Sequence, residues 1–266
     1  MPGAALDRWP AFVIAGLLAL VLLLAVFVSH AVGRRTRKRQ EPDGLGALET
    51  MASGLLGLLL AFNFSIAQSR FEEREKLLVS EANAIGTTYL RCSLLDAEDR
   101  RVCRDHLRDY AALRIAAYDS YGRAEGGTSL ASSLAKGERI QNDLWALVDR
   151  AVRASPDAAH ALLMSALNDL IDLDEERRAS LRITVPRAVS VAIMLACIGW
   201  ALLLGYSSGA QQKESRAGWV VVSLLISVVF GVAMDLDRPR TGFVTTVAAE
   251  RSMRNVLRMM ESPPVD

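Results

Sequence analysis

Four long windows of the chain are almost free of charge, and a charged residue bounds each of them on both sides. The windows are residues 9–33, 50–69, 188–212 and 217–234. As an α-helix the first is about 37 Å long, which exceeds the ~30 Å of hydrocarbon in a bilayer. All four satisfy the length rule for a membrane-spanning helix. The pattern therefore predicts an integral membrane protein with four transmembrane helices, arranged as two pairs.

The stretch between the second and third windows is rich in charge and has the periodicity of amphipathic helices. Its first apolar face is formed by Phe71, Leu78, Ala82, Ile85, Tyr89 and Cys92. This face predicts a helix that continues the second transmembrane helix without a break. Further helices are predicted over 97–121 and 130–153, with the segment 126–129 as a break, and a last one from Ser155 and Pro156 to Pro186. Because no alternating β-branched run predicts a strand, the fold class is all-α, with an extramembrane helical bundle.

These patterns divide the chain into four parts. Residues 1–69 hold the first transmembrane pair with a basic loop, 70–187 the helical extramembrane domain, 188–236 the second pair, and 237–266 a C-terminal tail. Two other interpretations fit less well. A signal peptide has its basic residues before a short apolar stretch, whereas here they follow a long one. Core helices of a soluble protein would leave large apolar surfaces uncovered in a chain of 266 residues.

The arginine and lysine content of the short loops predicts the orientation. The first loop carries five such residues within 34–39, against Arg8 alone before the first helix, and the loop between the third and fourth helices carries Lys213 and Arg216. Both loops fall on one side, the cytoplasm. We therefore expect the protein in the inner (plasma) membrane with its helical domain outside the cytoplasm. The basic C-terminal tail, which this topology exports, favours the opposite orientation.

The cysteines bear on the same question. Cys92 and Cys103 flank the turn signal LLDAEDR and can meet across a helical hairpin. In an oxidising compartment they can form a disulfide, and it is equally open that both are small apolar packing residues. Cys197 lies inside the third transmembrane helix, where we expect it to pack.

No constellation of catalytic or metal-binding residues is present in the sequence. His30, His106 and His160 are isolated, and neither HExxH nor CxxC occurs. The net charge is +1 and no basic stripe carries interleaved aromatic residues, so nucleic acid is not an expected partner. We expect no enzymatic activity, no cofactor and no metal.

Polar residues inside the second transmembrane helix are candidate functional residues, because unsatisfied polar groups in hydrocarbon are costly. Asn63 and Ser65 are two such residues. Either they face a pore, or Ser65 bonds its own backbone and Asn63 bonds a neighbouring helix.

A second polar set follows the fourth helix. Asp235 and Asp237 precede Arg238 and Arg240 and form a charged collar at the membrane interface. Two interpretations remain open for the collar: a stop signal with local ion pairs, or an ion-handling site.

Three segments of the chain resemble the bacterial bestrophin-like domain family: GLLGLLLAFNFSIAQSRFEEREKLLVSEANAIGTTYLR, NDLIDLDEERRASLR and MDLDRPRTG. The resemblance covers about residues 45–242, and EANAIGT and DLDRPR are its specific strings. The arrangement of helices is more distantly similar to that of bestrophins, which are pentameric anion channels. That similarity implies an ion pathway lined by the second transmembrane helix, with Phe62, Asn63, Ile66 and Arg70 along it. Bestrophins keep the helical domain and both termini in the cytoplasm, which is opposite to the orientation that the charges predict here.

Two functional hypotheses follow. The first is a homo-oligomer in the lipid bilayer that passes small ions, anions above all, through a pore lined by the second transmembrane helix. The alternative is a non-conducting membrane scaffold or sensor whose helical domain binds a partner or ligand.

Overall fold

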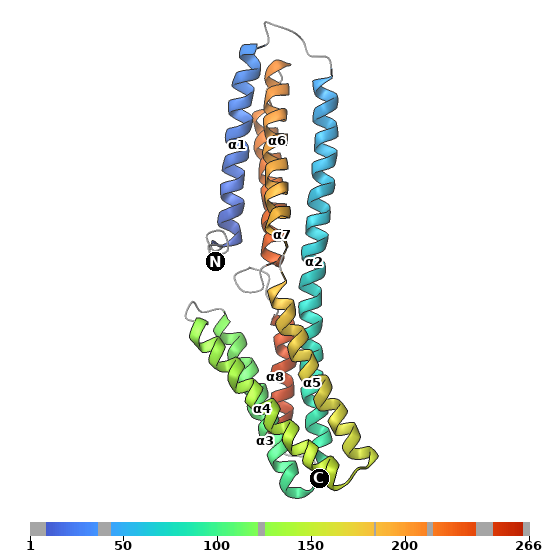
Figure 1. The fold of residues 1–266 in the computed structure, drawn as a ribbon. Helices are drawn as coiled ribbons and strands as arrows, with labels where there is room; N and C mark the ends of the chain where they lie inside the picture. Colours follow the sequence, from blue (N-terminus) through green and yellow to red (C-terminus); the bar gives the residue numbers. More distant parts are fainter. Residues whose placement is uncertain are drawn as a thin grey trace. The chain divides into compact units, whose positions relative to one another are not determined.

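The computed structural model describes residues 9–36, 44–121, 126–183, 185–211, 215–237 and 247–262. Within these ranges the chain is helical and contains no strand, which confirms the predicted fold class. The elements are α1 (Ala11–Thr36), α2 (Leu45–Arg91), the short 3-10 helix η2 (Cys92–Leu94), α3 (Ala97–Tyr121), α4 (Gly126–Ala154), α5 (Ala158–Arg182), α6 (Arg187–Ala210), α7 (Arg216–Asp237) and α8 (Val247–Glu261) (Figure 1). Four of them, α1, α2, α6 and α7, are long and apolar enough to cross a membrane, as predicted.

The chain divides into two compact units. The membrane unit comprises Met1–Phe71 and Thr184–Val244, and the extramembrane unit comprises Glu72–Ile183 and Thr245–Asp266. Helix α2 is a single helix of 47 residues that contributes to both. Its continuity was predicted, and it follows from a sequence in which no proline interrupts the helical periodicity.

In the membrane unit, α1 packs along α6 with their backbones in close contact. Gly205 lies against the backbone carbonyl of Val26, and Gly209 lies against that of His30. Small residues at this spacing allow two transmembrane helices to approach each other and gain van der Waals contact. Further packing comes from α7, whose Trp219 ring stands 4.8 Å from the His30 ring. Helix α2 joins this core through Leu56 and Leu60.

In the extramembrane unit, Ala82, Ile85 and Tyr89 of the predicted apolar face of α2 share one core with residues of α3, α4 and α5. The C-terminal helix α8 completes this core with Met253 and Met260, which are fully buried. The end of α8 is held by two hydrogen bonds to the Met260 carbonyl, one from the Tyr89 hydroxyl (3.1 Å) and one from Arg108 Nε (3.0 Å). A cation at the last carbonyls of a helix also interacts favourably with the helix dipole. The tail, to which the sequence assigned no structure, is therefore part of the extramembrane unit.

Two helix boundaries differ from the prediction. The segment 126–129 was expected to be a break, but α4 begins at Gly126 and includes it. In the first turn of a helix the backbone N–H groups have no intrahelical partner anyway, so glycine is tolerated there better than in the interior.

The start of α5 is the second difference. The expected cap was Ser155 followed by Pro156, but the N-cap is Asp157, whose carboxylate accepts a hydrogen bond from the His160 backbone N–H (2.9 Å). Ser155 instead donates its backbone N–H to Ala151 at the end of α4. The bond from His160 lowers the pKa of Asp157, because it favours the charged carboxylate.

Candidate functional site

Helix α2 has the most uncovered surface of the four membrane helices. Only 11% of the residues in its most apolar window are buried, against 28–39% in the other three. Apart from Phe64, the large exposed apolar residues of this span form one row at three- and four-residue spacing: Leu48, Met51, Leu55, Leu58, Phe62 and Ile66. A contiguous apolar row of this kind either faces lipid tails or is covered by another copy of the chain.

The four residues predicted to line the pathway differ in how far the rest of the chain covers them. Phe62 and Ile66 belong to the uncovered row, with 60% and 45% of their surface exposed. Asn63 is only 7% exposed and faces the core of the membrane unit. Arg70, seven residues and about two turns from Asn63, shares its face. The structure therefore leaves Phe62 and Ile66 uncovered and buries Asn63, while Arg70, one turn from Ile66, lies beside the uncovered row with its side chain 26% exposed.

Arg70 is part of a polar junction at the end of α7. Its Nη1 atom lies 3.6 Å from the Asp237 carboxylate. The same carboxylate accepts the backbone N–H of Val185, at 3.0 and 3.2 Å from its two oxygens. Asp237 thus connects α2, α7 and the segment before α6. Of the other collar residues, Asp235 is buried, while Arg238 and Arg240 lie outside the described residues.

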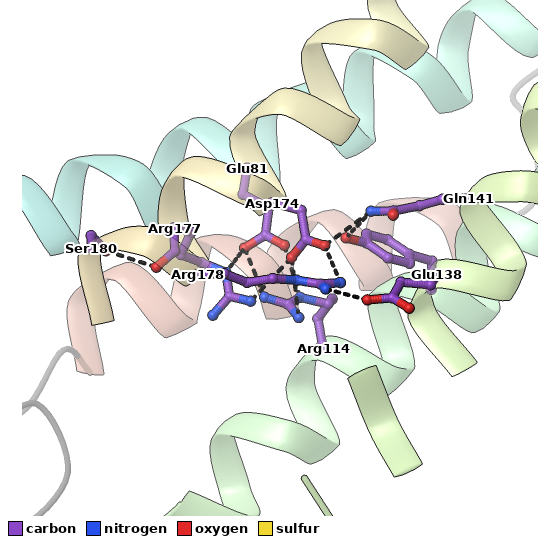
Figure 2. Close-up of polar contacts among 9 residues, drawn as sticks. Glu81, Arg114, Glu138, Gln141, Asp174, Arg177, Arg178 and Ser180 are labelled. Atoms are coloured by element: carbon purple, nitrogen blue, oxygen red, sulfur yellow. Dashed lines mark hydrogen bonds and ion pairs between the residues drawn. The ribbon is translucent and has the colours of Figure 1, made fainter. Parts of the chain in front are cut away.

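The extramembrane unit contains a buried ionic network that the sequence did not predict (Figure 2). Glu81 of α2 is fully buried and pairs with Arg114 of α3 at 2.8 Å and with Arg177 of α5 at 3.0 Å. Asp174 of α5 lies 3.1 Å from Arg177 and 3.5 Å from Arg114. These two carboxylates and two guanidinium groups balance in charge, so the interior carries no net charge at this point.

Polar side chains at one end of the network connect it to α4. Gln141 donates from Nε2 to the Tyr110 hydroxyl and to Asp174, at 3.1 Å in each case. Arg178 lies 2.6 Å from Asp174 and 2.7 Å from Glu138 at the surface (Figure 2). Burial raises the pKa of Tyr110 far above its ordinary value, and the charge of Glu81 raises it further, so this hydroxyl stays neutral. The network holds α2, α3, α4 and α5 together.

Two charged residues of the network stand at core positions of their amphipathic helices, and this pattern is visible in the sequence. Glu81 is next to Ala82 of the apolar face of α2, and Arg114 continues the face of α3 that includes Leu107 and Tyr110. A charged residue at a core position of an amphipathic helix requires a partner, because an unpaired buried charge is very costly. The sequence shows that need but not which helix supplies the partner.

Cys92 and Cys103 are joined by a disulfide that links η2 to α3, with their Cα atoms 6.0 Å apart. Both residues are fully buried in the core of the extramembrane unit. Cys197 is buried in the membrane unit. Among the residues that the structure describes, no group of three or more His, Cys, Asp or Glu could hold a metal ion.

Comparison with known proteins relates this architecture to one family. The family model described as "Bestrophin-like domain" matches residues 15–249. The crystal structure of a bacterial bestrophin homologue from Klebsiella pneumoniae matches with a TM-score of 0.65 and 19% identity, over 92% of this chain and 99% of that one. A variant of the same homologue matches with a TM-score of 0.69 and 18% identity, over 94% and 99%. At such identities the structural matches show a shared fold. The comparison with curated proteins found no match.

Proposed function

Because the chain belongs to the bestrophin-like domain family, we propose that it assembles in the membrane as a homo-oligomeric channel for small anions, with α2 along the pathway. The observation that supports this proposal is the uncovered row on α2. When copies of α2 gather around an axis, an apolar row that the rest of the chain leaves uncovered can line a closed, apolar constriction.

The chemistry of the row implies how such a pathway would be gated. From Leu48 to Ile66 the row is apolar over 19 residues, about 27 Å of helix. A narrow apolar constriction excludes water and thereby blocks ions, and a small widening restores conduction. In the proposed channel, the Phe62 side chains of all copies encircle the pathway, as do the Ile66 side chains, and these two apolar layers are the barrier to conduction.

The first prediction concerns this barrier. Replacing Phe62 by serine is expected to raise anion flux about tenfold, the change produced by about 1.4 kcal/mol in a barrier. The matched control is Leu225→Ser on α7, which is also strongly exposed and apolar but lies outside the proposed pathway. The measurement is chloride efflux from liposomes that contain the purified protein. Equal flux through the two variants would contradict the placement of Phe62, and reversal potentials under a salt gradient test the preference for anions.

The same apolar row also favours the alternative function, a non-conducting scaffold or sensor. A row without charged side chains packs as well against another helix as it lines a closed pore. A purified wild-type oligomer that passes no ions, and still passes none with Phe62→Ser, would support the scaffold.

We further propose that the protein lies in the inner membrane with the extramembrane unit outside the cytoplasm. The basic first loop supports this orientation. A disulfide between Cys92 and Cys103 also supports it, because structural disulfides persist mainly in oxidising compartments.

A second prediction tests the orientation. An impermeant maleimide is expected to label Arg153→Cys, at an exposed position of α4, in cells whose inner membrane is intact. The matched variant Arg35→Cys, at the exposed end of α1, should be labelled only after the inner membrane is opened. The reverse pattern would place the extramembrane unit in the cytoplasm.

A further inference from the structure

A groove of about 530 Å³ lies between α3 and α4 in the extramembrane unit. Its floor is apolar and is formed by Ala112, Leu113, Ala116 and Ile140. Its rim carries two cations of α4, Lys136 and Arg139, and one carboxylate, Asp109. Apolar grooves with a charged rim are typical docking sites for the face of an amphipathic helix.

The two cations on the rim are available for a partner. Lys136 and Arg139 are both exposed, and within the described part of the chain neither has a hydrogen bond or an ion pair. They are three residues apart on one helix, which separates them by about 4.5 Å along its axis. The groove therefore favours a helix that presents carboxylates at the same spacing.

Helix α5 has such a face. Its exposed row consists of Leu162, Ser165, Asp169, Asp172, Glu176 and Ala179. Asp169 and Asp172 are three residues apart, as Lys136 and Arg139 are, and an apolar or small residue stands at each end of the row. Leu162, at the start of the row, is 53% exposed.

This exposed row of α5, called the acidic row after Asp169, Asp172 and Glu176, faces away from the core of its own chain. Leu163, Leu167 and Leu170 occupy the opposite side of α5 and are fully buried. At 100° per residue, the middle of the exposed row lies about 200° around the helix from the middle of this buried side. A second copy of the chain is therefore the partner that brings the two surfaces together.

We propose that the acidic row of α5 docks in the α3/α4 groove of a neighbouring copy. The two surfaces differ, so the contact is heterologous, and repeating it around an axis closes a ring. Opposite charges across the interface fix the register and exclude pairing of like surfaces. This inference rests on the proposed function, which requires an oligomer, and names the surfaces that build it.

The test is charge reversal on each surface, with mass photometry of the full-length protein in detergent as the measurement. We expect the double variant Lys136→Glu, Arg139→Glu to raise the protein concentration at which half of the oligomer dissociates by about tenfold. The double variant Asp169→Lys, Asp172→Lys is expected to have the same effect. All four changes in one chain should restore association, because the opposite charges face each other again. Arg153→Glu, which changes an exposed cation outside the groove, is the matched control.

Cross-linking provides a test that needs no weakened variant. Arg139→Cys and Asp172→Cys in one chain should give disulfide-linked dimers and larger ladders, while either cysteine alone should not. Absence of ladders, or reversals that leave the mass distribution unchanged, would overturn the docking surfaces. So would a groove reversal that the acidic reversal fails to rescue, since it would indicate another anionic occupant such as a lipid headgroup. Chloride flux from the same preparations separates the two proposals. If the wild type conducts chloride and the charge reversals leave its oligomeric mass unchanged, the docking surfaces are refuted and the channel proposal is not.

Discussion

Replacing Glu81 by glutamine is expected to lower the free energy of unfolding of the extramembrane unit by about 3–5 kcal/mol. The substitution keeps the size of the side chain and removes its charge, and Glu81 is one of the two carboxylates that contact both Arg114 and Arg177. The guanidinium groups of Arg114, Arg177 and Arg178 then share Asp174 in a low-dielectric interior. The measurement is thermal unfolding of the purified protein in detergent, followed by circular dichroism, and the expected loss in Tm is about 10 °C.

The matched control for this prediction is Glu138→Gln at the surface end of the same network. Glu138 pairs with Arg178 but is 58% exposed on its side chain, so the loss should stay below about 1 kcal/mol. If the two glutamine variants melt at the same temperature, the buried network does not hold the four helices together.

Replacing Gly205 by alanine is expected to destabilise the membrane unit by about 3 kcal/mol. A Cβ atom at this position would collide with the Val26 carbonyl and the Ser29 hydroxyl of α1. Because the obstacle is largely backbone, the added methyl group can be accommodated only if α1 and α6 separate. That separation removes close contacts along the crossing, which are the main source of helix association in a bilayer.

Gly199→Ala is the control for Gly205→Ala, since it adds the same methyl group to the same helix. No atom lies within 4 Å of the Cβ position at Gly199, and alanine favours helix slightly. Thermal melting should therefore show a marked loss for Gly205→Ala and little change or a small gain for Gly199→Ala. A similar loss in both variants would mean that the close crossing of α1 and α6 does not contribute to stability.

Features that depend on local periodicity were predictable from the sequence. The four membrane helices follow from the length of their uncharged windows, and the unbroken α2 follows from an apolar face without proline. Helix α8 could have been found in the same way, since Met253, Val256, Leu257 and Met260 recur at helical spacing. The basic charge of the tail bears on its side of the membrane, whereas the spacing of these apolar residues indicates a helix.

The start of α5 shows a limit of the local rules. Ser155, Pro156 and Asp157 all suit the first positions of a helix, and the predicted start was Ser155 with Pro156. The choice of Asp157 depends on where α4 ends, and α4 extends to Ala154. Where one helix ends and the next begins therefore depends on how both helices pack, and not only on the residues of the turn.

The sequence by itself determined which segments of this protein are helices and which of them can lie in lipid, because hydrophobicity and helical periodicity are properties of neighbouring residues. Only the tertiary structure decided which side chains meet. It buried Asn63, paired Arg70 with Asp237 and left Phe62 and Ile66 uncovered. It also joined Glu81 to Arg114 and Arg177, which are 33 and 96 positions away in the chain. The physical reason is that a buried charge or a close helix crossing requires a partner, and the identity of that partner depends on how distant helices pack.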